Sequence, residues 1–454
     1  MPHPVRTTVA TLATAALTAG VLAAPALTAP AAAAPTSNRT DDMPSKSAAK
    51  WLSKEFNEGI MVGEFGPDYG LTIDAGIAMS VAGGFNREVR IVAGAIAPKL
   101  GEYVGDGEKE SYSGALGKAA TYARVAGYNP TNYGGVNLIT RLEDRVANAD
   151  AGATAGRISD KSEFGDFANV IGQSYAVRAL SLANSAEAFA ARDYLLKQQC
   201  PSGYFRLNFA KADAADQTCA DGAAGSEADP DATSLAIINL LESQDRTPAV
   251  QDSLNRAGAW LAARQRKSGA IRGAGGTAVI NTNSTGLGGY ALGMLDYRTA
   301  ASKAAVWVRR LQPVDKYQCK SALSPDTGAV AYRKDAINAA KTKGITEAAR
   351  DQWRRATSQA VLGLQYAPAA KDELRMESAR KRGVAGSRPQ FRAYGVAPGE
   401  RACMQVKGDF RRIIGKRTGE KVVRKLQLPT GNRKRVAVLK VADAQDKTWI
   451  RVFN

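Results

Sequence analysis

The chain has 454 residues, a formal net charge of +18, four cysteines and a single histidine, His3. Because His3 lies in an N-terminal segment that we expect to be removed, the mature chain has no histidine. That excludes Ser-His-Asp and Cys-His catalysis, histidine zinc sites and histidine as a general base. Carboxylate, lysine or tyrosine chemistry, oxygen-ligated metals, or binding without chemistry remain.

Residues 1–34 have the composition of a secretory signal peptide. One arginine precedes an uncharged stretch of Ala, Leu, Val and Thr, and small residues suited to signal peptidase follow. The alternative is an Ala-rich disordered tail. We expect residues 35–43 to be a disordered start of the mature chain. No later apolar stretch is long enough to span a membrane, so the sequence predicts a secreted protein, associated with the cell wall.

Two kinds of helical segment alternate along residues 44–370. Segments such as 247–265 carry apolar residues on one stripe only, as in Val250, Leu254, Ala257 and Leu261. Six others are apolar or small on every side, which indicates helices that are buried all round. They are residues 74–83, 113–127, 172–183, 231–241, 283–295 and 356–364.

A short motif recurs at the ends of the one-sided helices. "YLLKQQCPSGYF" begins at Tyr194 and "WLAARQRKSGAI" at Trp260, and Trp307 opens a partial copy. The motif resembles the repeat of the terpenoid cyclase and protein prenyltransferase superfamily, and exported bacterial proteins with squalene-cyclase-type repeats are the most similar. The resemblance implies a mainly α fold, an (α/α)6 toroid of six helical hairpins. An open superhelix of helix pairs is the alternative.

The four cysteines predict two disulfides in an exported chain. Cys200 and Cys219 bracket one loop and form the first expected pair. Cys319 with Cys403 follows by elimination, and it ties the C-terminal part to the rest of the chain.

Asp229 and Asp231 surround a proline just before a buried helical segment, and two interpretations stay open. The resemblance aligns Asp231 with the proton donor of class II cyclases and Asp229 with its neighbour, although Ala232 replaces the last Asp of that motif. The simpler interpretation makes Asp229 a helix N-cap, with Pro230 in the first position and Asp231 facing the helix dipole. Asp74 is expected to open another inner helix in the same way.

We therefore expect no favoured catalytic residue, no metal site and no cofactor. The prenyltransferase zinc site needs a histidine that the mature chain lacks. The main functional expectation is a non-catalytic binding protein of the cell envelope that holds a small molecule or glycan, as some exported toroids such as the cobalamin carriers do. The alternative is an exported cyclase-like or lyase-like enzyme with Asp231 as general acid. The expected ligand-binding residues are Asp74, Tyr175, Asp231, Asn283, Tyr290 and Gln359.

The C-terminal part changes its period. Residues 371–388 are expected to be a polar linker, and residues 389–454 alternate polar and apolar residues between turn-prone stretches, which predicts a small immunoglobulin-like β-sandwich. Residues 371–454 carry +14 of the net charge. Either this surface binds an anionic cell-wall polymer, or it is a solvated face that keeps the domain soluble. Nucleic acid is not expected as a partner.

Overall fold

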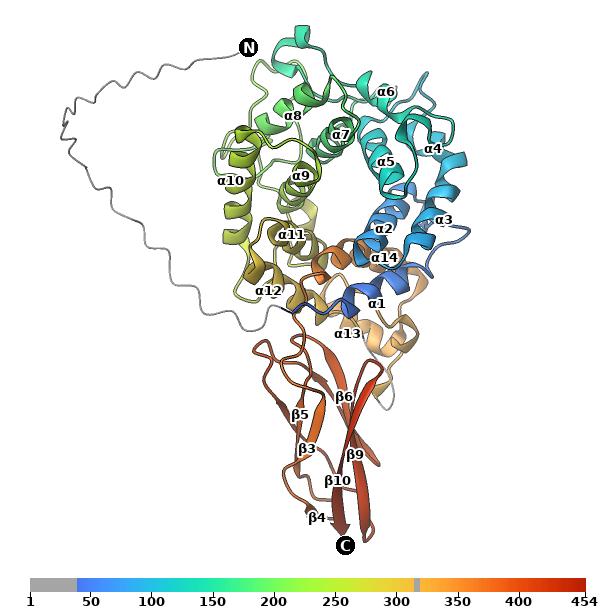
Figure 1. Ribbon diagram of the computed structural model, residues 1–454, viewed down its shortest axis with the longest axis vertical. Coiled ribbons are helices and arrows are strands. Elements are labelled where there is room, and N and C mark those ends of the chain that lie inside the picture. The colour runs from blue at the N-terminus through green and yellow to red at the C-terminus, as the bar shows by residue number, and fades with distance from the viewer. Residues whose placement is uncertain (1–38, 314–318) are drawn as a thin grey trace, which may run out of the picture. The chain divides into compact units, whose positions relative to one another are not determined.

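The computed structural model describes residues 39–313 and 319–454, as a helical part followed by strands (Figure 1). The expected signal peptide lies outside the described residues. Residues 39–43 were expected to be disordered, and this is wrong. Thr40 forms a β-bridge with Pro368, and Asp41 pairs with Arg309 at 2.7 Å. An ion pair to a buried arginine and backbone hydrogen bonds fix this stretch in place.

Six helices contact one another in a closed cycle, α2 to α5, α7, α9, α11, α14 and back to α2. Figure 1 shows them around the centre of the helical part. Small residues let them approach closely: a Cβ added at Gly286 on α11 would lie 2.7 Å from the Cα of Ala360 on α14. These helices contain most of each of the six segments that the sequence predicted to be buried all round. Their bounds are α2 (Tyr69–Ala82), α5 (Ser113–Val125), α7 (Val170–Leu182), α9 (Pro230–Glu242), α11 (Thr282–Met294) and α14 (Glu347–Leu364).

Further helices pack on the outside of this cycle, and most contact one or two of the inner helices. They vary in length from α4, which is one short turn, to α10, which has 17 residues. α4 and α13 are extra helices beyond a simple alternation of inner and outer helices. The exact number of helical hairpins therefore stays a prediction. The bounds are α1 (Met43–Leu52), α3 (Asn86–Ile96), α4 (Leu100–Val104), α6 (Leu138–Glu143), α8 (Ala188–Lys197), α10 (Pro248–Arg264), α12 (Arg298–Arg309) and α13 (Lys334–Lys343).

The glutamine and glycine of the repeated motif join neighbouring hairpins. Gln265 Nε2 donates to the carbonyls of Gly269, at 3.1 Å, and of Ala300 on α12, at 2.8 Å. Gly269 has a positive φ of 94°, and a Cβ there would lie 2.0 Å from the carbonyl oxygen of Lys303. Only glycine fits such a close approach. The motif therefore links one helical hairpin to the next through hydrogen bonds and a close backbone approach.

The other copies of the motif make equivalent hydrogen bonds. Gln199 donates to Gly203 and to Ser253 of α10, and both distances are 2.9 Å. Gln312 donates to Gly328 and, also at 2.9 Å, to Pro44 of α1. The last contact joins residues 268 positions apart and connects the segment that follows α12 to the beginning of the helical part. The repeat thus contributes directly to closing the cycle.

The C-terminal strands form two sheets, one of five strands in the order β4-β10-β9-β6-β7 and one of three in the order β3-β5-β8. Met376, Phe391, Met404, Leu439 and Ile450 belong to the buried cluster of these strands. The strands are β3 (Arg375–Ser378), β4 (Arg382–Val384), β5 (Gln390–Tyr394), β6 (Arg401–Val406), β7 (Asp409–Ile414), β8 (Val422–Lys425), β9 (Arg433–Val441) and β10 (Ala444–Phe453). A two-stranded ribbon of β1 (Val62–Gly63) and β2 (Gly66–Pro67) lies in the helical part.

The polar linker expected at residues 371–388 is wrong over two stretches. β3 pairs antiparallel with β5, and β4 pairs parallel with β10. Both strands are short and rich in charged residues, with little hydrophobic alternation, so the sequence did not reveal them. Both strands belong to the sheets.

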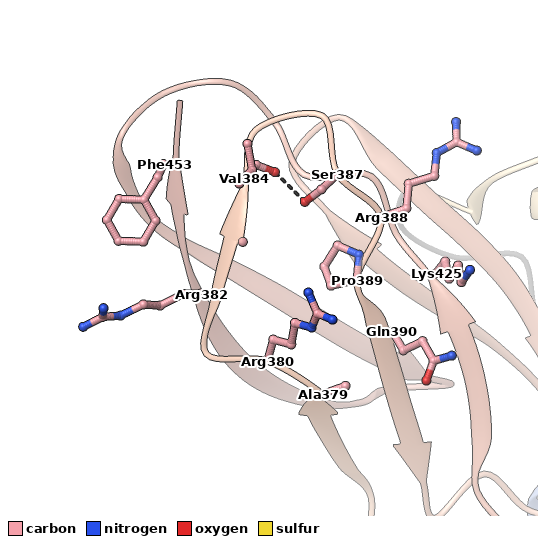
Figure 2. A pocket seen from close by; sticks show the side chains of 11 residues that line it. Ala379, Arg380, Arg382, Val384, Ser387, Arg388, Pro389, Gln390, Lys425 and Phe453 are labelled. Carbon is pink, nitrogen blue, oxygen red and sulfur yellow. Dashed lines mark hydrogen bonds between the residues drawn. The ribbon is translucent and has the colours of Figure 1, made fainter.

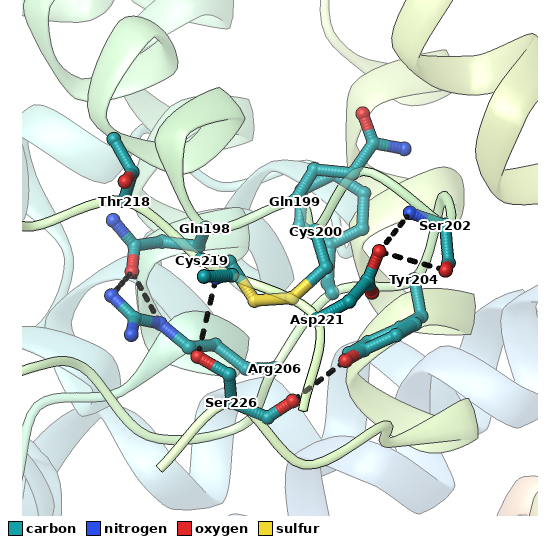
Figure 3. The surroundings of a disulfide bond; sticks show 12 residues. Gln198, Gln199, Cys200, Ser202, Tyr204, Arg206, Thr218, Cys219, Asp221 and Ser226 are labelled. Carbon is teal, nitrogen blue, oxygen red and sulfur yellow. Dashed lines mark hydrogen bonds between the residues drawn. A yellow bond between two sulfur atoms is a disulfide. The ribbon is translucent and has the colours of Figure 1, made fainter. Parts of the chain in front are cut away.

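Both expected disulfides are confirmed. Cys200 pairs with Cys219 and Cys319 with Cys403. Around the first, Arg206 donates to Gln198 Oε1 at 2.7 and 3.0 Å, and Tyr204 donates to the carbonyl of Ser226 at 2.8 Å (Figure 3). These bonds hold the loop that leads into α9. The second disulfide joins the helical part to β6, as expected.

The two disulfides agree with an exported protein, and export itself stays a prediction. Across residues 39–313 and 319–454, none of the helices has the length and apolar character needed to cross a bilayer.

Candidate functional site

The candidate site begins at the first turn of α9. Asp229 is the N-cap, and its Oδ1 accepts hydrogen bonds from the backbone N–H groups of Asp231 and Ala232, both at 2.8 Å. Pro230 occupies the first helical position, where no N–H is needed. Asp231 therefore stands one step inside the helix, with its side chain free for other contacts.

The carboxyl of Asp231 is buried without a cation beside it. Its Oδ1 has no hydrogen-bond partner among the described residues. Its one side-chain partner is the hydroxyl of Ser284, which in turn accepts from Asn281 at 3.2 Å. Burial raises the pKa of Asp231 to about 7; the negative charge of Asp229 adds to the rise and the bond from Ser284 opposes it. Asp231 thus carries a proton over much of the range below neutral pH.

Asp231 opens on a hollow of about 460 Å³ between the starts of α9 and α11 and the first half of α14. Among the described residues, one cation lies on its wall, Arg355, and it is already engaged: it pairs with Asp351 at 2.8 Å and with Asp68. The lining is polar, with one aromatic ring. The residues are Asp231, Gly276, Asn281, Asn283, Tyr332, Asp351, Gln352 and Arg355.

A second hollow, of about 310 Å³, lies on the axis of the helical cycle, because all six inner helices contribute to its wall. Lys118 on α5 pairs with Asp74 on α2 at 2.7 Å and donates to the carbonyl of Gly70 at 3.0 Å. Burial alone would lower the pKa of Lys118, but Asp74 and the phenols of Tyr103 and Tyr175 outweigh it and raise this pKa. The remaining wall is largely aliphatic: Ile77, Ile171, Leu235, Leu287 and Leu362.

The structure divides the expected ligand-binding residues among three places. Asp74, Tyr175 and Gln359 line the axial hollow, whereas Asp231 and Asn283 line the other. Tyr290 lines neither hollow. The centre of its ring lies 6.2 Å from the centre of the Tyr366 ring.

The expectation that Asp74 opens an inner helix is wrong. α2 begins at Tyr69, and its N-cap is Asp68, which accepts from the N–H of Leu71 at 2.8 Å. Asp74 lies in the second turn. The N-cap carboxyl of Asp68 precedes the apolar segment 74–83 from which the helix was predicted. The apolar segment alone therefore predicted a helix start that is five residues too late.

Several polar residues of the two hollows were not foreseen, among them Lys118, Tyr103, Asp351 and Arg355. Lys118 had a signal, because a lysine inside an otherwise apolar helix needs a buried partner. No sequence signal pointed to Arg355 or Asp351, since they lie one residue and five residues before the segment 356–364 that was predicted to be buried.

No protein family model and no curated protein matches the chain in sequence. Among solved structures, a protein from Actinoplanes is similar at 15% identity and a TM-score of 0.49, over 72% of this chain and 99% of that one. The type II terpene cyclase MstE from Scytonema is similar at 14% identity and a TM-score of 0.49, over 71% and 97%. A variant of MstE has been solved with its substrate, geranylgeranyl dihydroxybenzoate, at a TM-score of 0.47. The closed cycle of six inner helices agrees with the terpenoid-cyclase-like fold implied by the repeats.

The main functional expectation, a non-catalytic binding protein, is contradicted by this comparison. Among these similar structures, variants of MstE were solved in complex with substrate and with product. The environment of Asp231, and not the substrate of those neighbours, is what bears on this chain's own chemistry.

Proposed function

We propose that this protein is an enzyme in which Asp231 is the general acid. The observation that carries the proposal is the combination of a buried, unpartnered carboxyl oxygen with a pKa near 7 on the wall of a hollow. A general acid works best when its pKa lies near the working pH, because it is then both protonated and able to give its proton away. Carboxyls reach this state by burial without a cation.

The hollow suits a polar substrate better than a hydrocarbon. Protonation of an alkene needs a strong acid and a lining of aromatic rings for the cation, whereas this lining has one ring, Tyr332, and a carboxyl with a raised pKa. Transfer of a proton to the oxygen of a leaving group is the easier step for such an acid. The reaction class is therefore lyase-like rather than alkene cyclisation.

The other residues of the lining have supporting roles in this proposal. Asn281 and Ser284 hold the Asp231 carboxyl through their linked hydrogen bonds. Asp351 and Arg355 supply a fixed carboxylate and guanidinium across the same hollow. Asp351 is the carboxylate on this wall that could accept a proton from the substrate as Asp231 donates one.

The test compares two neighbouring carboxyls. Turnover is screened with 4-nitrophenyl glycosides and with polyuronates, which report leaving-group release and elimination. Asp231→Asn should lose about a thousandfold in turnover, the usual scale for a general acid, while Asp229→Asn, which keeps an N-cap, should keep it. Wild-type turnover in Asp231→Asn would overturn the proposal.

A further inference from the structure

The outer face of the five-stranded sheet carries a row of three cations on adjacent strands. In the strand register, Arg451 on β10 lies opposite Arg382 on β4 and opposite Lys434 on β9. Side chains that are paired in this way share a face and stand about 5 Å apart. All three side chains are exposed, while Ile450 and Val452, on either side of Arg451, are buried in the domain core.

This row disfavours folding, because like charges directly opposite each other repel. Within the described residues, none of the three pairs with a carboxylate. They rest instead on aromatic rings: Lys434 lies 4.4 Å from the ring centre of Trp449, and Arg451 and Arg382 lie 5.7 and 6.0 Å from that of Phe453. Cation–π contacts at exposed sites offset part of such repulsion. A row of unneutralised charge on a sheet suggests a partner that supplies the anions.

Two hollows extend the charge on both sides of the turn between β3 and β4. One, of about 730 Å³, is lined by Arg380, Arg382, Arg388 and Lys425, and none of the described residues on its wall is acidic (Figure 2). The other, of about 850 Å³, includes Lys434, Arg451 and Trp449, and its one acidic residue, Glu377, pairs with Arg375. Arg382 belongs to one hollow and Arg451 to the other, so the row links them.

We propose that this face, made of Arg382, Lys434 and Arg451 with the two hollows beside them, binds a linear acidic polysaccharide. Repeated cations favour a ligand with repeated anions, and guanidinium groups pair with carboxylates through two hydrogen bonds. Trp449, whose surface is 49% exposed, offers a flat apolar face to sugar rings. Ser387 and Gln390 offer hydrogen-bonding groups for hydroxyls. The two disulfides favour an oxidising compartment outside the cytosol.

The experiment measures binding of the full chain to polygalacturonate by isothermal titration calorimetry at low and high salt. The row variant, R382Q/K434Q/R451Q, is matched by K407Q/K421Q/R424Q, which removes the same charge from exposed positions elsewhere on the domain. We expect the row variant to lose about tenfold or more in affinity and the control to lose less than about threefold. Wild-type affinity should fall as salt rises.

Three results would overturn the proposal. Equal losses in the two variants would mean that net charge, and not the row, attracts the polymer. Tighter binding of wild type to duplex DNA or to poly(glycerol phosphate) than to polygalacturonate would identify another class of polyanion. A row variant that melts below the control would show that the row stabilises the fold, since relief of repulsion should leave its melting temperature equal or higher.

Discussion

The two hollows of the helical part each contain a partly buried aspartate, and the two aspartates have different surroundings. In the axial hollow, Asp74 faces the ammonium group of Lys118 at 2.7 Å. In the hollow at the start of α9, Asp231 faces a serine hydroxyl and the charge of Asp229, and the nearby guanidinium of Arg355 is held by Asp351 and Asp68.

The difference shows how a cation decides the state of a buried carboxyl. Beside a lysine, the carboxyl is half of an ion pair, and its role is to hold two inner helices together. Without one, burial favours the neutral acid, and the group keeps a proton that can be given away. The same residue type thus serves structure in one hollow and, in our proposal, chemistry in the other.

The largest expected effect concerns the pH dependence of stability. Below pH 4 Asp231 is protonated in both states; between pH 4 and 7 the folded chain holds a proton that the unfolded chain has lost, so stability falls as pH rises. The rise from 3.8 to about 7 corresponds to about 4 kcal/mol. Denaturant unfolding should show wild type losing about that much relative to Asp231→Asn across this window. A constant difference would mean that Asp231 has an ordinary carboxyl pKa in the folded chain.

The next effect concerns the axial hollow. Lys118→Met should lower the free energy of unfolding by about 2 kcal/mol at neutral pH, because it leaves Asp74 in a partly buried site without its cation. The double variant Lys118→Met/Asp74→Leu should recover most of the loss, since well-packed apolar pairs can replace buried ion pairs. If the single variant is as stable as wild type, the pair has no structural role.

The smallest effect separates Asp229 from its neighbour. Asp229→Ala should cost about 1 kcal/mol through the lost cap, and Asp229→Asn a few tenths at most, because asparagine caps helices equally well. Thermal unfolding of the two variants measures this. A large loss with asparagine would indicate that the charge of Asp229, and not its capping geometry, is what the fold uses.

The sequence predicts the inner helices well because burial on every side leaves a local signature. Segments such as 231–241 and 283–295 are apolar or small throughout, and the structure places both in inner helices. The disulfides follow from cysteine number and context. The sequence does not predict how these elements meet. The hydrogen bond from Gln312 to the carbonyl of Pro44 spans 268 positions and was not anticipated.

The candidate site was partly foreseen, for the same reason. Asp231 stood out because it follows a proline and begins a segment that is apolar on every side. Its lack of a cation could not be predicted, because that depends on Arg355 pairing with Asp68, 287 positions away. Strands β3 and β4 were missed because their charged residues face solvent and carry little hydrophobic alternation.

The most direct test of the account is the titration of Asp231 by carbon NMR of the full chain labelled at aspartate carboxyls. We expect one resonance with a midpoint near pH 7, absent from Asp231→Asn and shifted to lower pH in Asp229→Ala, since that variant removes a neighbouring negative charge. A midpoint near pH 4 for Asp231 would contradict the account, because the residue would then be an ordinary ionised carboxylate at neutral pH.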